Sequence, residues 1–595
     1  MDDKILDWVL PAEKFSQDGD PQSMRAAARE IFALDKNSAE GLAIMAESSL
    51  YLGNLPEAES FARYALAVEP KHLRGRLVTG GVAVKNFKLK AQLQILEGVI
   101  DDAHKELRNL RDQLQEHNRK FAFNLRKRTA ADEDFEKKIA KENFIAKSLL
   151  FKALCWRSNG LYLTGEPARA SQALFEASSL TDNDEFAAEL YSKHLFLRNY
   201  REMSPAQTKE LAQKYNSFFA DVTPFRHAKN FDADKKIHVG YISPDFREHA
   251  VANFIPPLLQ DYDAENFSVT CYATGKSDYV TDKLRNFKTN WRILYGEETS
   301  AAAKVIHDDK VDILVDLSGH SQDSCLPILA YRPAPVQICG IGYTATTGLD
   351  TVDYFLSDKI CSPENQPSNF TEKILRVDPC NLCYAPGLIR EMPAPELRAP
   401  VLKNDFITFG SFNNFAKIHD ELLYLWRAIL ERVPNSRLIL KNKICSLDEG
   451  RELVKEKFSK FGLPLDRIEL RPYSPDYLEQ YNEIDVALDT YPYTGGTTTC
   501  EALYMGVPVI TLRGKTHGAR LGASILSAAD LSELITHNSM DYINKAVQLS
   551  RRKELLVAYH VGLREHLQNS ALMDSGKYIR ELEKIYRSVW KDFCK

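Results

Sequence analysis

The chain has 595 residues, 44% of them hydrophobic, which is too long for one core and too apolar for wholesale disorder, so we expect three or four domains. Its 77 Lys and Arg residues against 82 Asp and Glu residues give a net charge of −5, a balance that argues against a nucleic-acid partner. No run of 18 apolar residues occurs, and Met1-Asp2-Asp3-Lys4 places acidic residues where a signal peptide needs basic ones. We therefore expect a cytoplasmic protein without a membrane span.

The ten cysteines are sparse and scattered, which fits reduced thiols better than a disulfide framework. Cys380 and Cys383 form the only Cys-x-x-Cys pair. A structural zinc site needs two further ligands at comparable spacing, and the neighbouring sequence offers neither a second cysteine pair nor a close pair of histidines. We expect structural or incidental thiols and no metal site.

The first 230 residues have helical periodicity and a spacing of small residues that is typical of tetratricopeptide repeats, which are 34 residues long. In one repeat, small residues stand where two antiparallel helices touch, and a proline ends the pair: Ala46, Gly53, Ala58, Ala65 and Pro70. A shift of one repeat length aligns residues 32–36 with 66–70, which indicates a degenerate repeat before it. A third copy has the same small residues at Gly165, Ala170 and Ala177.

Between these repeats, apolar residues alternate spacings of four and three, which is heptad periodicity: Leu96, Ile100, Ala103, Leu107, Leu110 and Leu114. This pattern predicts a long helical hairpin inserted in the repeat array. A dimerising coiled coil is the alternative, so the oligomeric state is left open.

After Phe231 the pattern changes to short β-rich runs that alternate with segments of helical length, which predicts parallel α/β sheets. The strand candidates are residues 237–242, 311–317, 406–409, 437–440, 485–488 and 507–512. The proline-rich stretch 392–400 is the best linker in the chain. We therefore predict three parts: helical repeats over 1–230, a first Rossmann-like domain over 231–395, and a second one with C-terminal helices over 396–595.

Ligands of open α/β sheets bind beyond the carboxyl ends of the strands, so the residues that follow each strand matter most. Gly495, Gly496, Thr497 and Thr498 form a glycine-rich turn followed by hydroxyl residues where a helix opens, which suits a phosphate. The alternative is purely structural, because Thr498 and Glu501 have the spacing of a capping box.

A second such place follows the predicted strand 406–409. Lys417 can neutralise a diphosphate there, and Asn414 can help to position it. His249 and His320 stand on loops after two other strands, where a histidine is more often solvated than catalytic. Two Asp-x-Asp triplets, at 182–184 and 232–234, precede the sheets, and we interpret them as helix caps or solvated acids.

Taken together, these segments resemble the O-GlcNAc transferase and SPINDLY-like enzymes of glycosyltransferase family 41. The resemblance covers nearly the whole chain, and its segments occur in the family's order and spacing: residues 240–246 with His249, 332–337, Gly342-Tyr343, 412–414 with Lys417, 485–490, and 496–498. It implies an α/β GT-B fold of two Rossmann-like domains preceded by tetratricopeptide repeats.

The resemblance also implies roles for individual residues. Lys417 and Asn414 would meet the nucleotide diphosphate, Thr497 and Thr498 would bind phosphate oxygens, and Glu501 would bind the ribose in place of the family's frequent aspartate. His249 would lie near the sugar and acceptor, and Gly342 would leave room for the sugar. Tyr477 stands where relatives often carry a histidine that stacks on uracil, and its ring can still stack.

By this resemblance the protein is an inverting, metal-independent glycosyltransferase that moves GlcNAc from UDP-GlcNAc to Ser or Thr of a protein held by the repeats. It would need no cofactor besides this donor. Candidates to accept the hydroxyl proton are His249, His320 and Asp316. The alternatives are a GDP-fucose O-fucosyltransferase, a UDP-glucose N-glycosyltransferase acting on Asn, and a non-catalytic repeat scaffold.

Overall fold

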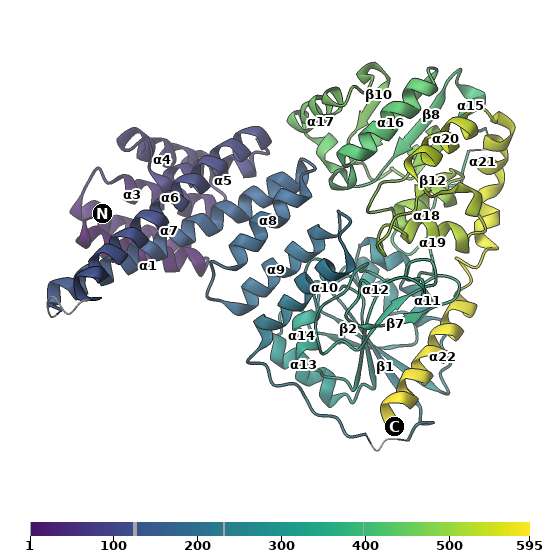
Figure 1. The fold of residues 1–595 in the computed structure, drawn as a ribbon, viewed down its shortest axis with the longest axis horizontal. Coiled ribbons are helices and arrows are strands. Elements are labelled where there is room, and N and C mark those ends of the chain that lie inside the picture. The colour runs from purple at the N-terminus through teal and green to yellow at the C-terminus, as the bar shows by residue number, and fades with distance from the viewer. Residues whose placement is uncertain (1, 123–127, 230–231, 397) are drawn as a thin grey trace. The chain divides into compact units, whose positions relative to one another are not determined.

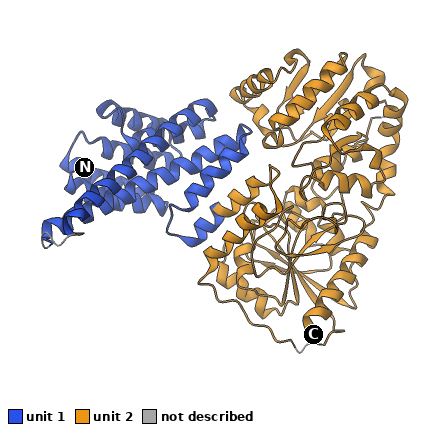
Figure 2. Ribbon diagram, in the orientation of Figure 1, with its two compact units in different colours: residues 1–190 blue, residues 191–595 orange. Residues whose placement is uncertain are grey.

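The computed structural model describes residues 2–122, 128–229, 232–396 and 398–595. The chain divides into two compact units, residues 1–190 and residues 191–595 (Figure 2). The predicted boundary between residues 230 and 231 falls outside the described residues, as does Leu397 of the predicted linker. The predicted division at 230 and 395 therefore stays a prediction.

The first unit consists of helices in consecutive antiparallel pairs. They are α1 (Asp3–Gln17), α2 (Pro21–Leu34), α3 (Ala39–Tyr51), α4 (Leu55–Val68), α5 (Leu73–Lys85), α6 (Leu89–Ala122), α7 (Ala130–Leu163) and α8 (Pro167–Ser178). Ala46, Ala58 and Ala65 are fully buried where α3, α4 and their neighbours touch. Gly53 and Gly165 have φ of +76° and +78° in the turns between paired helices. These glycines occupy equivalent turns, as the predicted repeat pattern requires.

The predicted hairpin is formed by α6 and α7, which are 34 residues each and pack along one another. The heptad residues of α6 lie at this contact, since Leu110 is buried with Ile139 and Ala146 of α7, and Leu107 and Leu114 pack on the same cluster. The apolar stripe that could have served a coiled-coil dimer is therefore used within the chain.

Four helices of the first unit meet around a buried ion cluster, which we define as Glu13, Glu40, Glu47, Arg74 and Lys152. The Arg74 guanidinium is inaccessible to solvent and bonds all three glutamates, with Nη2 at 2.6 Å from Glu13 Oε2 and Nε at 2.6 Å from Glu40 Oε1. Lys152 Nζ lies 2.5 Å from Glu13 and 2.6 Å from Glu47. These charges connect α1, α3, α5 and α7, so they constrain the register in which the helices stack.

The second unit holds two parallel sheets. In the described part of the chain, the first has the strand order β3-β2-β1-β4-β5-β6-β7, and the second has the order β10-β9-β8-β11-β12-β13. The strands of the first sheet are β1 (Ile237–Ser243), β2 (Phe267–Ala273), β3 (Asn290–Ile293), β4 (Ile313–Asp316), β5 (Val336–Cys339), β6 (Tyr354–Ser357) and β7 (Lys373–Arg376). Those of the second are β8 (Ile407–Ser411), β9 (Ser436–Lys441), β10 (Ile468–Arg471), β11 (Val486–Leu488), β12 (Val509–Leu512) and β13 (Ile535–Thr536).

Helices connect and cover these strands, as parallel pairing requires. In the first part of the unit they are α9 (Asp184–Arg198), which begins in the first unit, α10 (Pro205–Gln213), α11 (Pro256–Leu259), α12 (Tyr279–Leu284), α13 (Thr299–Asp308) and α14 (Leu326–Ala330). Around the second sheet they are α15 (Pro400–Lys403), α16 (Asp420–Arg432), α17 (Asp448–Lys460), α18 (Thr497–Tyr504), α19 (Leu521–Ala528), α20 (Ser539–Ser550) and α21 (Lys553–Gln568). The 3-10 turns used below are η2 (Ala250–Asn253) and η3 (Phe415–Lys417).

The last helix, α22 (Ser575–Cys594), belongs by its contacts to the first sheet and not to the second, where the sequence placed it (Figure 1). Tyr586 and Tyr241 of β1 have their hydroxyls 3.3 Å apart, and Trp590 Nε1 donates to the Asp232 carbonyl at 3.2 Å. The reason is its amphipathic pattern, whose apolar side is buried on α11 and β5.

Every predicted strand is present, with ends that differ by at most two residues from the predicted ones. Each sheet consists of parallel strands covered by helices, so the predicted architecture of two Rossmann-like domains behind a helical repeat region is confirmed.

Candidate functional site

Lys417 lies in the short loop that follows β8. Its Nζ donates to the Thr494 carbonyl at 2.9 Å and lies 4.6 Å from the centroid of the Tyr493 ring. Burial lowers the pKa of Lys417 to about 8, and the nearby Asp489 carboxylate opposes that shift. A lysine amine with this pKa is largely protonated at neutral pH and can meet a negative group.

The loop after β11 is shaped by the buried Asp489. Its Oδ1 accepts from the Thr490 and Gly495 N–H groups at 2.8 and 2.7 Å, and its Oδ2 accepts from the Thr511 hydroxyl at 2.8 Å. A Cβ on Gly495 would come within 2.6 Å of two threonine hydroxyls of α18. The turn therefore needs a glycine to bring its backbone close to the start of that helix.

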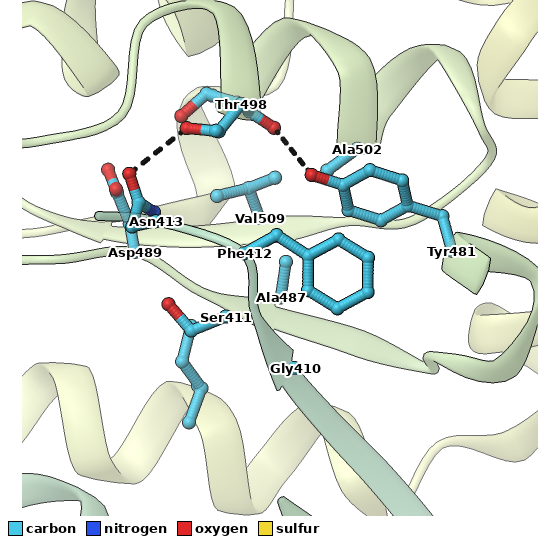
Figure 3. Close-up of a pocket in the computed structure, with 12 residues that line it drawn as sticks. Gly410, Ser411, Phe412, Asn413, Tyr481, Ala487, Asp489, Thr498, Ala502 and Val509 are labelled. Atoms are coloured by element: carbon cyan, nitrogen blue, oxygen red, sulfur yellow. Dashed lines mark hydrogen bonds between the residues drawn. The ribbon is translucent and has the colours of Figure 1, made fainter. Parts of the chain in front are cut away.

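The helix α18 starts without a side-chain cap. Its N-cap residue is Gly496, and the main-chain N–H groups of a first helical turn have no partner within the helix. Thr498 Oγ1 donates instead to Asn413 Oδ1 at 3.1 Å, from the loop after β8 (Figure 3). The capping-box alternative for Thr498 and Glu501 is therefore wrong, because neither side chain closes the helix start.

A pocket lies between the ends of β8 and β11 and the first turn of α18 (Figure 3). Asn413 and Thr498 point toward one another at its rim, and the Tyr481 hydroxyl donates to the Thr498 carbonyl at 3.4 Å. The remaining lining includes Gly410, Ser411, Phe412, Ala487, Asp489, Ala502 and Val509. A helix N-terminus with a half-buried lysine in a neighbouring loop is an arrangement that suits phosphate groups.

Glu501 lies one turn into α18 and is buried. The Tyr477 hydroxyl donates to Glu501 Oε1 at 2.5 Å, and burial raises the pKa of Glu501 to about 7. The Arg390 guanidinium lies 5.0 Å from the Tyr477 ring centroid and donates to Glu248 Oε1 at 3.2 Å. Arg390 follows the first sheet in a region without periodic pattern, so no sequence signal indicated it.

His249 lies on the loop after β1, with 41% of its side chain exposed. Its Nδ1 accepts from the Val251 N–H at 3.4 Å and lies 3.4 Å from Asp245 Oδ2, and partial desolvation of the ring lowers the pKa of His249. The adjacent Ala250 carbonyl accepts from Thr497 Oγ1 at 3.2 Å, so this loop of the first sheet touches the start of α18. A neutral, accessible imidazole thus lies one residue from a contact with the helix N-terminus.

Asp316 and His320 are both fully buried near the end of β4. Asp316 accepts from the Ser318 N–H, the Ser318 hydroxyl and the Gly319 N–H at 3.0, 2.6 and 2.8 Å. His320 Nε2 donates to the Thr347 carbonyl at 2.7 Å, and its Nδ1 lies 2.7 Å from the Ser192 hydroxyl. Burial lowers the pKa of His320 to about 4. These bonds favour a structural role for both side chains.

Two further predicted residues have clear local roles. Asn414 Oδ1 accepts from the Ala416 N–H at 3.0 Å and so caps η3, which holds Lys417. A Cβ on Gly342 would lie 2.0 Å from the Leu317 carbonyl oxygen, so this glycine is required by a close approach of two loops. Their predicted contacts with diphosphate and sugar stay predictions.

The structure thus brings Lys417 and Thr498 to one edge of the second sheet, with Thr497, Glu501 and Tyr477 on or against the same helix. Sequence reasoning missed Asn413 as the partner of Thr498, and it missed Tyr493 beneath Lys417. Asn413 lies inside a motif that the resemblance used, and Tyr493 lies between two of them, so proximity in sequence to Lys417 and Thr497 was the available signal.

No group of three or more His, Cys, Asp or Glu side chains that could hold a metal ion occurs among the described residues. Asn183 of one Asp-x-Asp triplet caps the start of α9, and Asp234 of the other pairs with Lys591 at 2.9 Å. The cysteines are free thiols, with Cys380 and Cys383 buried. Within the described ranges, no helix is both long and apolar enough to cross a membrane.

Two Rossmann-like parallel sheets, one after the other in the chain, define a GT-B architecture. A model of glycosyl transferase family 41 matches residues 202–380 and 397–582. That match covers more than half of the chain, and the chain belongs to this family. The resemblance noted in the sequence is confirmed.

The relatives are consistent with this assignment. The protein named Probable UDP-N-acetylglucosamine-peptide N-acetylglucosaminyltransferase SPINDLY from Solanum lycopersicum is 39% identical over 369 residues, which cover 61% of this chain and 39% of that protein. The Arabidopsis thaliana protein of the same name is 38% identical over 372 residues, or 61% and 40% of the two chains. The chain thus matches about two fifths of the length of these relatives.

Among solved structures, an O-GlcNAc transferase mutant from Thermobaculum terrenum is similar over 99% of this chain and 98% of that one. The TM-score is 0.68 and the sequence identity is 26%. This similarity includes the helical repeat region as well as both sheets.

Proposed function

We propose that the protein is an inverting, metal-independent glycosyltransferase that moves GlcNAc from UDP-GlcNAc to Ser or Thr hydroxyls of a protein acceptor. The observation that carries the proposal is the position of Lys417 Nζ, bonded to Thr494 O just before the glycine turn that opens α18. The relatives' printed names support the donor and the peptide acceptor.

The leaving group is a nucleoside diphosphate, on which negative charge develops as the bond to the sugar breaks. Lys417 would neutralise that charge, and the main-chain N–H groups of Thr497 and Thr498 would donate to phosphate oxygens. A hydrogen bond from either hydroxyl to phosphate would replace its present bond to Ala250 O or Asn413 Oδ1. Because a lysine and a helix N-terminus supply positive charge, the reaction needs no divalent cation at this place.

The nucleoside would extend along α18 toward Glu501 and Tyr477. Glu501 Oε1 accepts from Tyr477, and Oε2 is the atom that we expect to accept from ribose hydroxyls. The Tyr477 ring would stack on the base, with Arg390 fixing the orientation of that ring.

Attack by a hydroxyl of the acceptor requires a group that takes its proton. Of the three candidates, His249 fits best, because it is accessible, its pKa is lowered so that it is neutral at pH 7, and Asp245 orients it. Asp316 and His320 are buried and already bonded. Transfer with inversion then takes one step, in which the oxygen–sugar bond forms as the sugar–phosphate bond breaks.

The experiment compares melting temperatures with UDP-GlcNAc, GDP-fucose, UDP-glucose and UDP, followed by transfer to Ser- and Thr-containing peptides in excess EDTA. A ligand at 100 times its dissociation constant adds about 2.7 kcal/mol of stability, so the donor should give the largest shift. Transfer should persist in EDTA.

A larger shift of the melting temperature with GDP-fucose or UDP-glucose would show that the donor is that nucleotide sugar. Sugar found on Asn of the peptide would show that the acceptor is Asn and not Ser or Thr. Loss of turnover in EDTA with recovery in Mn²⁺ would overturn metal independence. No shift with any sugar nucleotide would favour a non-catalytic scaffold.

A further inference from the structure

The residues that follow α9 form a bridging loop, which we define as residues 199–203. Asn199 Nδ2 donates to the Tyr343 hydroxyl of the first sheet's loops at 3.0 Å. Glu202 Oε1 accepts from the Lys515 N–H, in the loop after β12 of the second sheet, at 2.6 Å. Between them Tyr200 is 3% exposed and stacks on the Tyr493 ring, with centroids 5.0 Å apart and planes inclined by 18°.

Tyr493 is the side chain on which these contacts converge. Its hydroxyl accepts from Thr344 Oγ1 at 3.2 Å, and its carbonyl accepts from Thr490 Oγ1 at 2.8 Å. Lys417 Nζ lies 4.6 Å from the centroid of the same ring and bonds the carbonyl of the next residue, Thr494. The ring orientation that Tyr200 supports is thus the orientation that meets the lysine.

We infer that Tyr200 is a positioning residue for Lys417, acting through the Tyr493 ring. An aromatic face attracts an ammonium group, so Tyr493 favours the charged form of Lys417 and fixes the place of its Nζ. Stacking with Tyr200 removes the rotational freedom of Tyr493 that would let the ring leave that place. The bridging loop, which comes from the helical part of the chain, thereby sets the charge at the diphosphate site.

The charged groups around Lys417 determine in which pH range a change of activity can be assigned to its titration. Asp489 faces it from the loop after β11, and burial raises the pKa of Asp489 to about 6, so this carboxylate is ionised above pH 7. His419, two residues along, lies among Lys457, Arg201 and Asp420, and burial lowers its pKa to about 4. Between pH 7 and 9 the group among these that titrates is therefore Lys417, with a pKa of about 8.

The inference rests on the proposed function, because it takes the donor diphosphate as the group that Lys417 meets. The test measures kcat/KM for donor turnover against pH in the full chain and in Tyr200→Leu and Tyr200→Phe. In the unaltered protein kcat/KM should fall as pH rises past about 8, where Lys417 loses its proton. We call the pH at which this fall begins the bend of the profile. Tyr200→Leu should lower the bend by about half a pH unit and should lower kcat/KM at pH 9 about threefold.

Tyr200→Phe keeps the stacked ring and should keep the bend where it was. Tyr493→Leu should shift the bend at least as far as Tyr200→Leu, and adding Tyr200→Leu to it should cause no further shift, because Tyr200 acts through that ring. If Tyr200→Leu has no cooperative melting transition, Tyr200→Met, which is unbranched and fills similar space, takes its place.

A folded Tyr200→Leu enzyme with the original bend and kcat/KM would overturn the inference, and so would additive shifts in the double variant. The proposed function fails by a different result, namely full transfer by Lys417→Ala. An inactive Lys417→Ala together with an unshifted Tyr200→Leu contradicts the positioning role alone.

Discussion

Lys417 combines partial burial, a lowered pKa and a hydrogen bond to main chain, which together distinguish it from the fully exposed lysines of the chain. Sequence alone could place it after a strand and could match it to a family motif. It could not show that Tyr493 and Asp489 surround it, because both come from a loop more than 70 residues away.

Replacement of this lysine is the most direct test at the residue scale. We expect Lys417→Ala to lower kcat/KM by at least about a hundredfold, since loss of one preorganised charge contact to the transition state costs roughly 3 kcal/mol. Lys443→Ala, at an exposed position after β9, is the matched control and should leave turnover unchanged. Steady-state kinetics and a melting curve of each variant decide between a lost contact and a lost fold.

Glu501 gives a prediction with a defined pH dependence. Its folded pKa of about 7 exceeds the ordinary 4.5, so the folded protein binds the extra proton and loses stability as pH rises from 4.5 to 7. Gln carries no such charge, so Glu501→Gln should melt at a higher temperature than the unaltered protein at pH 8. Its donor KM should be raised at pH 8 and less so at pH 6, where the acid is protonated and resembles the amide.

Tyr477→Phe is the companion variant, because it removes the hydroxyl that holds the Glu501 pKa down. The pH at which the donor KM changes should then move upward. A donor KM for Glu501→Gln that equals the unaltered value at pH 8 would leave Glu501 with a structural role only.

At the scale of elements, the sequence predicted those strands that are flanked by glycine or proline turns and have a continuous apolar run. It missed the short strands β3, β5, β6, β7, β10 and β13, because runs of two to four residues carry little periodicity. It also missed the seven-residue strand β2, for which shortness is no explanation. The start of α18 shows a different limit. The spacing of Thr498 and Glu501 fits a cap, yet tertiary partners from other loops bond both side chains.

The loop after β4 offers a pH test of stability. The pKa of His320 is about 4 in the folded protein against 6.5 in an unfolded chain, so below pH 6.5 the unfolded state binds the extra proton and stability falls as pH falls. On going from pH 7.5 to 5.5, the unaltered protein should lose about 1 kcal/mol more than His320→Gln. Chemical unfolding at both values measures this difference, and parallel pH dependences would contradict it.

The helices of the first unit depend on the buried ion cluster. Arg74→Met would leave Glu13 and Glu47 buried with Lys152 alone and Glu40 with His72, and we expect a loss of about 3 to 5 kcal/mol of unfolding free energy. Arg76→Met lies on the same helix and breaks an exposed pair with Asp102, so it should cost about 1 kcal/mol or less. Urea unfolding followed by helical circular dichroism compares the two. Similar losses would mean that the cluster is solvated.

At the scale of the whole molecule, the repeats and the two sheets were predictable because periodicities of 34, 3.6 and 2 residues each leave a pattern in one sequence. The association of α22 with the first sheet was not, because an amphipathic helix does not show in its sequence which apolar surface it covers.

The repeats carry the prediction about the acceptor. A chain that begins at Asn183 keeps α9 and the bridging loop, so donor hydrolysis should survive. Transfer to a protein acceptor should fall at least about tenfold, which corresponds to about 1.4 kcal/mol of lost binding. A melting transition must first show that the shortened chain is folded, since removing the array exposes apolar faces. Undiminished transfer would remove the main reason for assigning a protein acceptor.

The position of α22 means that the helices covering the first sheet do not all come from one continuous stretch of chain. A fragment ending at the proline-rich linker would leave the side of the first sheet that receives Tyr586 and Trp590 uncovered, and the complementary fragment would end in an amphipathic helix with no surface to cover. Each piece expressed alone should therefore aggregate, whereas the two expressed together should reassociate through that helix. Because the chain passes between the sheets twice, once through the linker and once before α22, any hinge that opens the donor site must bend at both crossings.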